Sequence, residues 1–349
     1  MDKPGPKKKI TQNDVARYAR VSRSMVSYVI NGSSRMVAPE TRNKIIKAIE
    51  ALEYRPNKFA QALLLGKSEA LGDKQIGVIL CNSEVFLRPY YAEILAGIHL
   101  AAYEKSYHIH FIRFFEELKN PILFNQLIHP EEICGLLLVA TDQVLKTDQD
   151  WHIISRIRER IAQIVCVEWQ TSGLTSIFFD RHGTALKATA YLFDQGYQDI
   201  AYIGESDERI SGFKQAFLAR GMDSSRLYID GSARDMPSGY AAMETLFRAC
   251  EQGKRALPQG ICAGCDEVAM GILTLLHERR VAIPATIGLI SIDNIEMAEY
   301  VFPPLTTMHI PKQAMGYQAV DMIINHTAHQ GDRARSVSLP SSLVIRKSC

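Results

Sequence analysis

Apolar residues in the first sixty positions recur at the spacing of short helices. The run Thr11-Gln-Asn-Asp14 has the form of a capping box, in which the side chains of the two end residues each accept the backbone N–H of the other. The helix that it opens carries Val15, Ala16 and Ala19 on one face. We therefore expect an amphipathic helix that begins after Thr11 and ends near Arg20.

A second and a third helix follow the first. Ser22 is a suitable N-cap for a helix over residues 23–30, which Asn31-Gly32 ends. Pro39 suits the first turn of a third helix, which ends before Arg55. Two short helices joined by a tight turn, with a third closing a small core, is the helix-turn-helix plan. The inward positions expected in these two helices are Val26, Val29, Ile30, Ile45, Ile46, Ile49 and Leu52.

From about Gln75 the pattern changes to short apolar runs that alternate with helical stretches. This alternation is typical of a parallel sheet covered by helices on both faces. About eleven such units are too many for one compact sheet, so we expect two lobes, each built on a doubly wound parallel sheet. The strand candidates are 76–80, 109–114, 135–140, 164–167, 177–180, 199–203, 260–263, 287–293 and 343–345.

Charge is distributed unevenly along the 349 residues. The net charge is +2, but residues 1–67 alone carry +9 and the remainder carries −7. A basic end on an acidic body indicates a polyanionic partner for that end. A disordered basic tail would explain Lys7, Lys8 and Lys9, but the other positive charges stand among periodic apolar residues. Three short helices alone would also suit a protein-interaction bundle, and the positive charge favours DNA.

Composition excludes several classes of protein. The hydrophobic content of 47% and charged content of 22% are ordinary for a globular protein. No apolar run reaches the roughly 18 residues of a membrane span, and the basic start lacks the apolar stretch of a secretory signal. We therefore expect a cytosolic protein with no membrane partner. Its seven cysteines are odd in number and stand mostly in apolar runs, as reduced buried thiols do.

Metal and catalytic sites are not expected. Cys262-Ala-Gly-Cys265 lacks the second cysteine pair of a zinc site, and His108 and His110 are weak evidence for a metal. The acidic pairs Glu116-Glu117 and Glu131-Glu132 are adjacent, so their side chains diverge. No nucleophile elbow or phosphate loop occurs. The sequence thus predicts no enzyme, no cofactor and no metal.

The second predicted helix leaves Arg23, Ser24, Ser27 and Tyr28 outside its apolar stripe. These side chains are of the hydrogen-bonding types that read base edges or hold phosphates. We therefore expect this helix to face a duplex groove.

The N-terminal residues resemble the headpiece of the lac repressor/galactose repressor (LacI/GalR) family. The resemblance implies that Arg23, Ser24 and Tyr28 lie in the major groove and that residues 56–65 form a hinge helix on the operator, with Leu63 as a wedge in the minor groove. Leu64 and Leu65 are expected to pack against the protein. The matching positions are Asp14-Val15-Ala16, Ala19, Val21-Ser22, Val26-Ser27, Val29-Ile30-Asn31-Gly32, Glu40-Thr41-Arg42, Ala48, Leu52, Tyr54-Arg55-Pro56-Asn57, Ala60 and Leu63.

The resemblance gives a set of expected DNA contacts and two departures from the family pattern. Arg20 stands where the family usually has Gly, so either a left-handed residue there costs about 1 kcal/mol, or the turn differs and Arg20 meets a phosphate. Met25 and Tyr28 replace the commoner Thr and Arg, which leaves the operator sequence open. The expected DNA-binding residues are Thr11, Arg20, Ser22, Arg23, Ser24, Ser27, Tyr28, Asn31, Arg55, Asn57, Ala60 and Leu63.

The large domain resembles the periplasmic sugar-binding fold that this family carries. The elements that match are Arg209-Ile-Ser-Gly212-Phe213, and Ile290–Asn294 with Pro303–Thr307. The implied organisation is a basic tail (1–9), a headpiece (10–55), a hinge helix and linker (56–74) and an effector-binding and dimerisation domain (75–349). Within that domain we expect an N-lobe of about 75–173 plus 304–335 and a C-lobe of about 174–303 plus 336–349.

Polar residues at predicted strand ends indicate an effector site. Ligands of open α/β folds bind at the carboxyl ends of strands, where Asp180 and Asp293 fall, and Arg209 offers a planar fork of donors. Surface or interlobe ion pairs, and simple packing of the aromatic residues and of Trp169, are the alternatives. The expected effector-binding residues are Tyr90, Tyr91, Asp180, Arg209, Cys265, Asp266 and Asp293.

Two substitutions point to an unusual effector. Cys265 stands where the family often has Asn, and Ser291-Ile292 replaces a common Gly-aromatic pair, so hydrogen bonds to a common sugar are lost. We expect a small polar, carbohydrate-like effector that shifts the population between two states.

Helix-turn-helix regulators read two half-sites, so a homodimer on a near-palindromic operator is expected. A short tail after 343–345 without leucine heptads favours a dimer over a tetramer. A transport-type binding protein is the rival hypothesis, which the basic headpiece and missing signal oppose.

Overall fold

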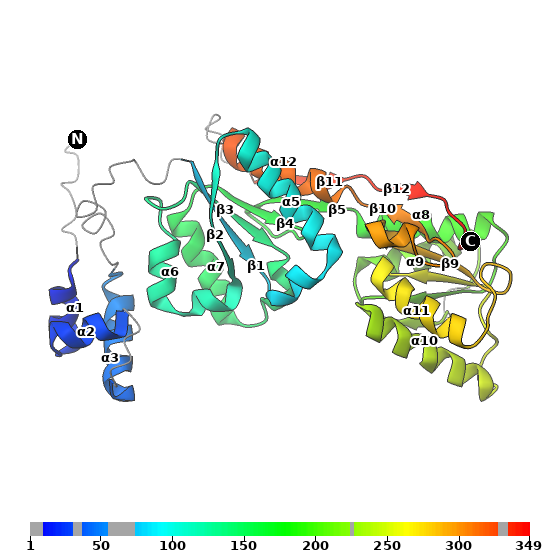
Figure 1. Ribbon diagram of the computed structural model, residues 1–349, viewed down its shortest axis with the longest axis horizontal. Helices are drawn as coiled ribbons and strands as arrows, with labels where there is room; N and C mark the ends of the chain where they lie inside the picture. Colours follow the sequence, from blue (N-terminus) through cyan, green and yellow to red (C-terminus); the bar gives the residue numbers. More distant parts are fainter. Residues whose placement is uncertain (1–9, 31–36, 55–73, 224–226, 327–333) are drawn as a thin grey trace. The chain divides into compact units, whose positions relative to one another are not determined.

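The computed structural model describes residues 10–30, 37–54, 74–223, 227–326 and 334–349 (Figure 1). Of the expected DNA contacts, Asn31, Arg55, Asn57, Ala60 and Leu63 lie outside these ranges. Contacts divide the chain into two compact units. The first unit comprises Met1–Val85, Ile98–Ser176 and Gly316–Arg335, and the second comprises Phe86–Gly97, Ile177–Met315 and Ser336–Cys349.

Three short helices form the N-terminal headpiece, as the periodicity predicted. They are α1 (Gln12–Ala19), α2 (Arg23–Ile30) and α3 (Pro39–Ala51). Their shared core removes apolar side chains from water, which stabilises the fold by about 1.5–3 kcal/mol for each large aliphatic residue. Ile30, Ile46 and Leu52, expected inside, are only partly buried. The fully or nearly buried core residues are Val15, Ala16, Ala19, Val26, Val29, Ile45, Ala48, Ile49 and Tyr54.

Local hydrogen bonds set where these helices begin. The capping box is confirmed, since the Asp14 N–H donates to Thr11 Oγ1 at 3.3 Å and the Thr11 N–H donates to Asp14 Oδ2 at 2.9 Å. The Met25 N–H donates to Ser22 Oγ at 3.3 Å, which is the predicted cap of α2. Pro39 stands in the first turn of α3.

The first of the two six-stranded sheets has the order β11-β5-β4-β3-β1-β2, and its strands β1 to β4 lie in the first unit. β1 pairs in parallel with β2 and β3, and β3 pairs in parallel with β4. Leu136 and Leu138 of β3 face a core formed with α6 (Pro121–Leu127) and α7 (Asp148–Arg160), while Gly135 faces Ile323 of α12 (Lys312–His326). The strands are β1 (Gln75–Leu80), β2 (His108–Phe114), β3 (Gly135–Val139), β4 (Ile164–Val167), β5 (Thr175–Phe179) and β11 (Ser336–Leu339).

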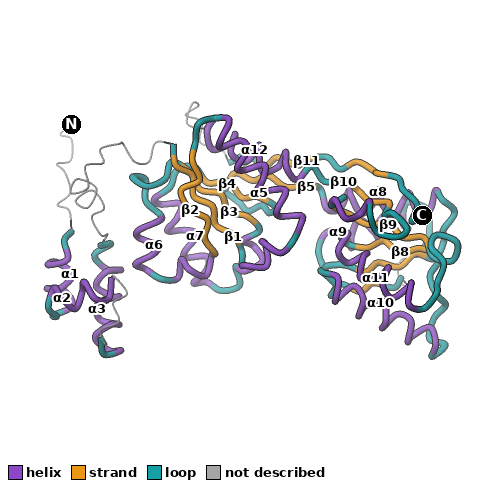
Figure 2. Tube along the Cα trace, in the orientation of Figure 1, coloured by secondary structure: helices purple, strands orange, loops and turns teal. Residues whose placement is uncertain are grey.

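The second unit contains a second six-stranded sheet in the order β12-β10-β9-β8-β6-β7. Its core lies between the sheet and the pair α10 (Met236–Glu251) and α11 (Asp266–Glu278). α8 (Arg181–Asp194) and α9 (Glu208–Leu218) also belong to this unit, and α8 packs on β8 and β9 (Figure 2). α5 (Pro89–Glu104) begins in the second unit, and its residues from Ile98 onward belong to the first. The strands are β6 (Ile200–Ile203), β7 (Ile229–Asp230), β8 (Gly260–Ala263), β9 (Gly288–Asp293), β10 (Thr306–His309) and β12 (Ser342–Val344).

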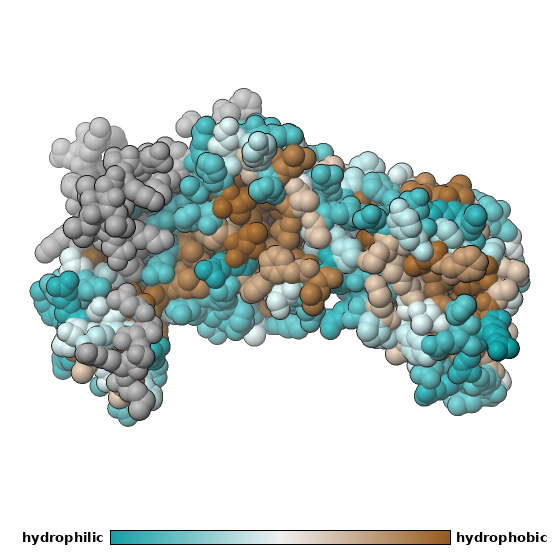
Figure 3. Space-filling view, in the orientation of Figure 1, coloured by the Kyte–Doolittle hydropathy of each residue, from teal (hydrophilic) through white to brown (hydrophobic). Residues whose placement is uncertain are grey.

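The hydropathy of the surface agrees with helices that turn their apolar sides toward the core. The region of Figure 3 in which α10 lies is mostly hydrophilic, as expected for a helix whose apolar side faces the core. Single exposed apolar residues also occur, and the most exposed are Phe302 at 88%, Leu87 at 82%, Tyr103 at 78% and Tyr300 at 77%.

One strand departs from the expected lobe boundaries. β10 lies in a segment expected in the N-lobe, but it pairs with β9 and belongs to the second unit. Residues 336–349 belong to the second unit, although β11 at their start pairs with β5 in the first sheet. Periodicity identifies a strand but not its neighbour, because pairing depends on where each crossover ends. The short strands β7, β10 and β11 were not predicted as strands, since they have few residues and β11 is largely exposed.

The seven cysteines are all free, and Cys81, Cys166, Cys262 and Cys265 are buried, as expected of reduced thiols. No helix within the described ranges is long and apolar enough to cross a membrane. In the same part of the chain, no group of three or more His, Cys, Asp or Glu side chains is placed to hold a metal ion.

Candidate functional site

The N-terminal half of α2 presents polar side chains away from the headpiece core. Arg23 and Ser24 are exposed, while Ser27 and Tyr28 are half-buried beside the apolar stripe. Arg23 Nε donates to Gln12 Oε1 at 3.4 Å, a weak contact that leaves other guanidinium donors available. The start of a recognition helix is where base contacts are made in helix-turn-helix proteins, so the arrangement suits groove reading.

The turn ahead of α2 adopts the conformation expected from the substitution at its centre. Arg20 has φ 55° and ψ 47°, in the left-handed region, and its N–H bonds the carbonyls at the end of α1. A non-glycine residue costs about 1 kcal/mol there. Of the two alternatives raised for Arg20, the strained left-handed turn is the one observed. Its side chain is exposed, as is Thr11, whose hydroxyl is engaged in the capping box.

The second site lies in the second unit, where β9 ends at Asp293. This side chain is 5% exposed, and its carboxylate accepts no hydrogen bond from the described part of the chain. Burial raises the pKa of Asp293 well above its usual range, and the nearby Asp266 raises it further, against the opposing charges of Lys312, Arg209 and Arg88. A buried carboxylate with free acceptor positions is suited to a ligand that donates hydrogen bonds.

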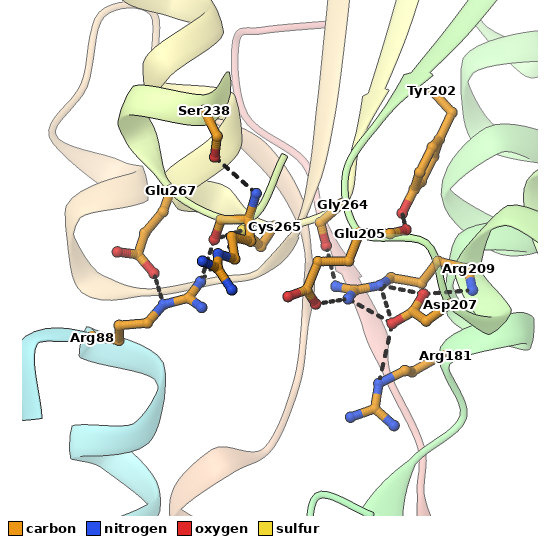
Figure 4. Close-up of polar contacts among 11 residues, drawn as sticks. Arg88, Arg181, Tyr202, Glu205, Asp207, Arg209, Ser238, Gly264, Cys265 and Glu267 are labelled. Atoms are coloured by element: carbon orange, nitrogen blue, oxygen red, sulfur yellow. Dashed lines mark hydrogen bonds and ion pairs between the residues drawn. The ribbon is translucent and has the colours of Figure 1, made fainter. Parts of the chain in front are cut away.

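Arg209 of α9 uses most of its N–H donors in hydrogen bonds within the protein. Nε and Nη2 bind Asp207 at 2.7–3.0 Å, Nη2 also binds Glu205 Oε2 at 2.6 Å, and Nη1 donates to the Gly264 carbonyl at 2.6 Å (Figure 4). A guanidinium has five N–H donors, so one on Nη1 is left for a ligand. Glu205 is 43% exposed, and a ligand that displaced it would free a second donor.

Asp266, in the first turn of α11, holds the end of β9 in place. Oδ1 accepts from the hydroxyls of Ser291 and, at 2.7 Å, Thr307, and Oδ2 accepts the N–H of Ile295 at 2.8 Å. Burial raises the pKa of Asp266 to about 6, although these hydrogen bonds oppose the shift. Both oxygens of this predicted effector residue are thus engaged within the protein, and its contact with an effector stays a prediction.

Arg88 precedes α5 and connects it to the first turn of α11. Nε donates to Glu267 Oε2 at 2.8 Å and Nη2 donates to the Arg234 carbonyl at 2.6 Å (Figure 4). Nη2 also lies 3.9 Å from the sulfur of Cys265, the residue that precedes α11. The thiol is a weak acceptor, so Arg88 is held mainly by the carboxylate and the carbonyl.

The other residues considered for the effector site make contacts within the protein. Tyr90 and Tyr91 are buried and stack edge to face at 5.3 Å, with the Lys312 nitrogen 5.9 Å from the Tyr90 ring centroid. Asp180 caps α8, since Oδ1 accepts the Gly183 N–H at 2.8 Å. Trp169 belongs to the core of the first unit, where its indole N–H binds the Leu138 carbonyl, so packing is its observed role.

Sequence reasoning missed most of the charged residues around Asp293. Arg88, Glu267 and Lys312 were not proposed, although Lys312 follows the matched Pro303–Thr307 element by five residues and has Ile310, Pro311, Ala314 and Met315 close to it in the chain. A lysine in a mostly apolar run is a signal for a buried ion pair. Glu205 and Asp207 precede the matched Arg209 element and were not proposed either.

Comparison with known proteins agrees with both parts of the chain. Residues 11–57 match the model of bacterial regulatory proteins of the lacI family, and residues 189–349 match the periplasmic binding protein-like domain. The transcriptional repressor PurR of Klebsiella pneumoniae subsp. pneumoniae is 27% identical over 97% of this chain and 96% of its own. PurR of Photorhabdus laumondii subsp. laumondii is 28% identical over the same shares.

Solved structures share the fold over nearly the whole chain. The transcriptional regulator CelR in complex with cellobiose superposes with a TM-score of 0.68 at 23% identity, covering 98% of this chain and 100% of its own. The lac repressor dimer bound to operator and the anti-inducer ONPF gives a TM-score of 0.67 at 23% identity, covering 98% and 99%.

A helix-turn-helix headpiece followed by two parallel α/β sheets defines a two-part regulator, with a DNA-binding end and a binding domain of the periplasmic type. This chain belongs to the LacI family of bacterial regulatory proteins. The resemblance inferred from the headpiece residues is therefore confirmed, and so is the expected fold class.

Proposed function

We propose that the protein is a transcriptional repressor that binds a near-palindromic operator as a homodimer and responds to a small polar effector held at Asp293. The observation that carries the DNA-binding part is the exposed start of α2, where Arg23 and Ser24 follow the left-handed turn at Arg20. Residues 31, 55, 57, 60 and 63 belong to the same proposed interface by their resemblance to the family. The relatives are named transcriptional repressors, which supports a regulator rather than an enzyme.

The effector proposal rests on the free acceptor positions of Asp293 and the one spare donor of Arg209. Together they offer both hydrogen-bonding senses to a polyhydroxylated ligand, as a sugar requires. CelR was solved with cellobiose, which fits a carbohydrate-like ligand for this fold. The cysteine at position 265 and Ser291, which is committed to Asp266, set this site apart from one built for a common sugar.

The dimer proposal has support from the surface of the second unit. Tyr300 and Phe302 are 77% and 88% exposed and adjacent to the buried turn after β9. Large aromatic residues are enriched at protein interfaces. The lac repressor, which shares the fold, was solved as a dimer.

Selection from random duplex oligonucleotides tests the DNA part. The protein is expected to enrich one near-palindromic sequence and to bind it with a steep inverse dependence on salt. A selection at moderate salt that enriches no sequence would contradict the proposal.

A thermal-shift screen with sugars, sugar acids, polyols and nucleosides tests the effector part. A compound that binds the native state raises the melting temperature, and Asp293→Asn should reduce that increase. An equal increase in the variant would remove Asp293 from the site. Arg209→Ala is a second probe, expected to abolish the response to the compound while leaving operator affinity nearly unchanged.

A further inference from the structure

The chain adopts an uncommon backbone conformation where β9 ends. Asp293 has φ 117° and Asn294 has φ 54°, two consecutive non-glycine residues with positive φ. Such conformations are strained for residues with a Cβ and persist only where their surroundings fix them. The carboxylate that we propose for effector binding is thus carried on a strained turn.

The side chain of Lys312 holds this turn through hydrogen bonds to its backbone. Its Nζ donates to the Asp293 carbonyl at 2.5 Å and to the Asn294 carbonyl at 3.2 Å, and lies 3.4 Å from Glu93 Oε1. The side chain is 0% exposed, and an ammonium has three N–H donors. Three acceptors therefore satisfy one buried cation, which is the condition for keeping a charge away from water.

Other contacts at the turn bind different atoms. Arg346 Nη2 donates to the Asn294 side chain at 2.8 Å, and the Asn294 N–H donates to Thr307 Oγ1 at 3.3 Å. The Ile310 N–H makes a longer bond of 3.4 Å to the Asp293 carbonyl. Within the described residues, Lys312 alone donates to the carbonyls of both strained residues.

The position of this lysine is electrostatically unfavourable for its own helix. Lys312 is the first residue of α12, where the helix dipole disfavours a cation. Helix stability therefore does not account for a lysine there, whereas the two carbonyls and the carboxylate of Glu93 do. Glu93 lies on α5, so the same ammonium also links the turn to that helix.

The charge of Lys312 acts on the proposed effector carboxylate. Asp293 is faced by Asp266 from α11, by Arg209 from α9, by Arg88 from before α5, by the Cys265 thiol and by Lys312 from α12. The Lys312 and arginine charges lower the pKa of Asp293, against burial and Asp266, which raise it. Removing one of these cations favours the protonated carboxyl.

We infer that Lys312 is a positioning residue of the effector site, which holds the Asp293–Asn294 turn through two backbone carbonyls and places a buried positive charge close to the Asp293 carboxyl group. This inference deepens the proposed function and rests on it. Neither of the tests below uses an effector, so a failed effector screen and a failed test of Lys312 are distinguishable.

Lys312→Met and Lys105→Met form a matched pair in the full-length protein. Lys105 binds Asp321 of α12 at 2.8 Å, so its removal also breaks a lysine ion pair to this helix but leaves the turn untouched. Carbon NMR of aspartate labelled at the carboxyl carbon reports the titration of Asp293, assigned with Asp293→Asn. We expect the Asp293 midpoint to rise by about one pH unit or more in Lys312→Met and to stay unchanged in Lys105→Met.

Hydrogen exchange measured by mass spectrometry gives the second readout. Lys312→Met should speed exchange in the segment 293–295 by about tenfold or more, with little change in the strands of the first sheet. Lys312→Arg, which keeps the charge and the donors, should restore both the midpoint and the protection.

If Lys312→Met fails to fold, Lys312→Gln replaces it, since an amide keeps donors without charge and should still raise the Asp293 midpoint. An unchanged midpoint in the neutral variants would overturn the electrostatic role. Faster exchange spread evenly over the chain, with no excess at 293–295, would overturn the positioning role and leave ordinary packing.

Discussion

Arg88 Nε and Glu267 Oε2 are 2.8 Å apart, which joins the residue that precedes α5 to the first turn of α11. The residues are 179 positions apart in the chain, and Glu267 is 9% exposed at its side chain. A nearly buried carboxylate that loses a bound cation destabilises the folded state, so this pair allows the stability of the second unit to be tested.

Arg88→Ala should lower the free energy of unfolding by about 1–3 kcal/mol, because it leaves Glu267 buried without its cation. Urea unfolding of the two single variants and of Arg88→Ala/Glu267→Ala measures this in a double-mutant cycle. The double variant should lose less than the sum of the singles. Strictly additive losses would show that the two side chains do not interact in solution.

Arg20→Gly should raise headpiece stability by up to about 1 kcal/mol, since glycine adopts φ 55° without a Cβ penalty. Arg20→Val, which is β-branched, should lower it. Thermal unfolding monitored in the headpiece measures both. A less stable glycine variant would show that the Arg20 side chain stabilises the turn.

The salt dependence of operator binding by the same variant shows whether Arg20 contacts a phosphate. Each lost phosphate contact reduces the slope of log affinity against log salt concentration by about one.

Arg23→Ala should weaken binding to the selected operator by about 1–3 kcal/mol, roughly 5- to 150-fold, if Arg23 reads a base edge. Binding to unrelated duplex should change much less. Fluorescence anisotropy at fixed salt measures both, and Arg17→Ala, an exposed arginine on α1, is the control. Equal losses on both duplexes would assign Arg23 to the phosphate backbone instead.

Asp266 should make stability depend on pH in a defined window. Its pKa in the folded protein is about 6 against an ordinary 3.8, so the folded state binds more protons between these values. Its contribution is therefore fully present below pH 3.8 and is lost as pH rises through about 6. The difference in melting temperature between the wild type and Asp266→Asn, measured from pH 4 to 7, reports the titration of Asp266 together with that of Asp293, whose pKa the Asp266 charge raises. A difference that is constant over the window would contradict the raised pKa.

Phe302→Glu should shift the protein from dimer toward monomer, since it places a charge on a side chain that is 88% exposed in the single chain. We expect the dimer dissociation constant to rise by about tenfold or more, as for loss of an interface anchor. Sedimentation analysis measures it, with Leu218→Glu, an exposed apolar residue elsewhere on the unit, as the control. An unchanged constant for Phe302→Glu alone would place the interface elsewhere.

Sequence reasoning recovered the headpiece almost to the residue, because its signals are local. The Thr11 cap, the 3.6-residue spacing of Val26 and Val29, and Pro39 each act within one helix turn. It also proposed Asp293 and Arg209, each from a contiguous motif, and their effector role stays a prediction. Most strands of the two sheets were predicted, but the short strands β7, β10 and β11 were not, and strand pairing is decided by long-range contacts.

The polar contacts around Asp293 could not be predicted from the sequence. The roles of Lys312 and Arg88 depend on their ion-pair partners Glu93 and Glu267, which lie on other elements of the fold. Asp266 was expected to contact an effector, and the structure engages both of its oxygens with Ser291, Thr307 and Ile295. Roles that depend on which residues meet across the sheet cannot be derived from spacing alone.

The helix that carries Glu93 and the helix that begins with Lys312 also meet through their backbones. A Cβ added at Gly97 of α5 would lie 2.0 Å from the carbonyl oxygen of Gln313 on α12, with backbone atoms on all three nearest contacts. Backbone cannot move aside as the end of a side chain does, so a residue larger than glycine at position 97 would push α5 and the start of α12 apart. Because Gln313 directly follows Lys312, such a substitution would also displace the lysine that holds the Asp293–Asn294 turn.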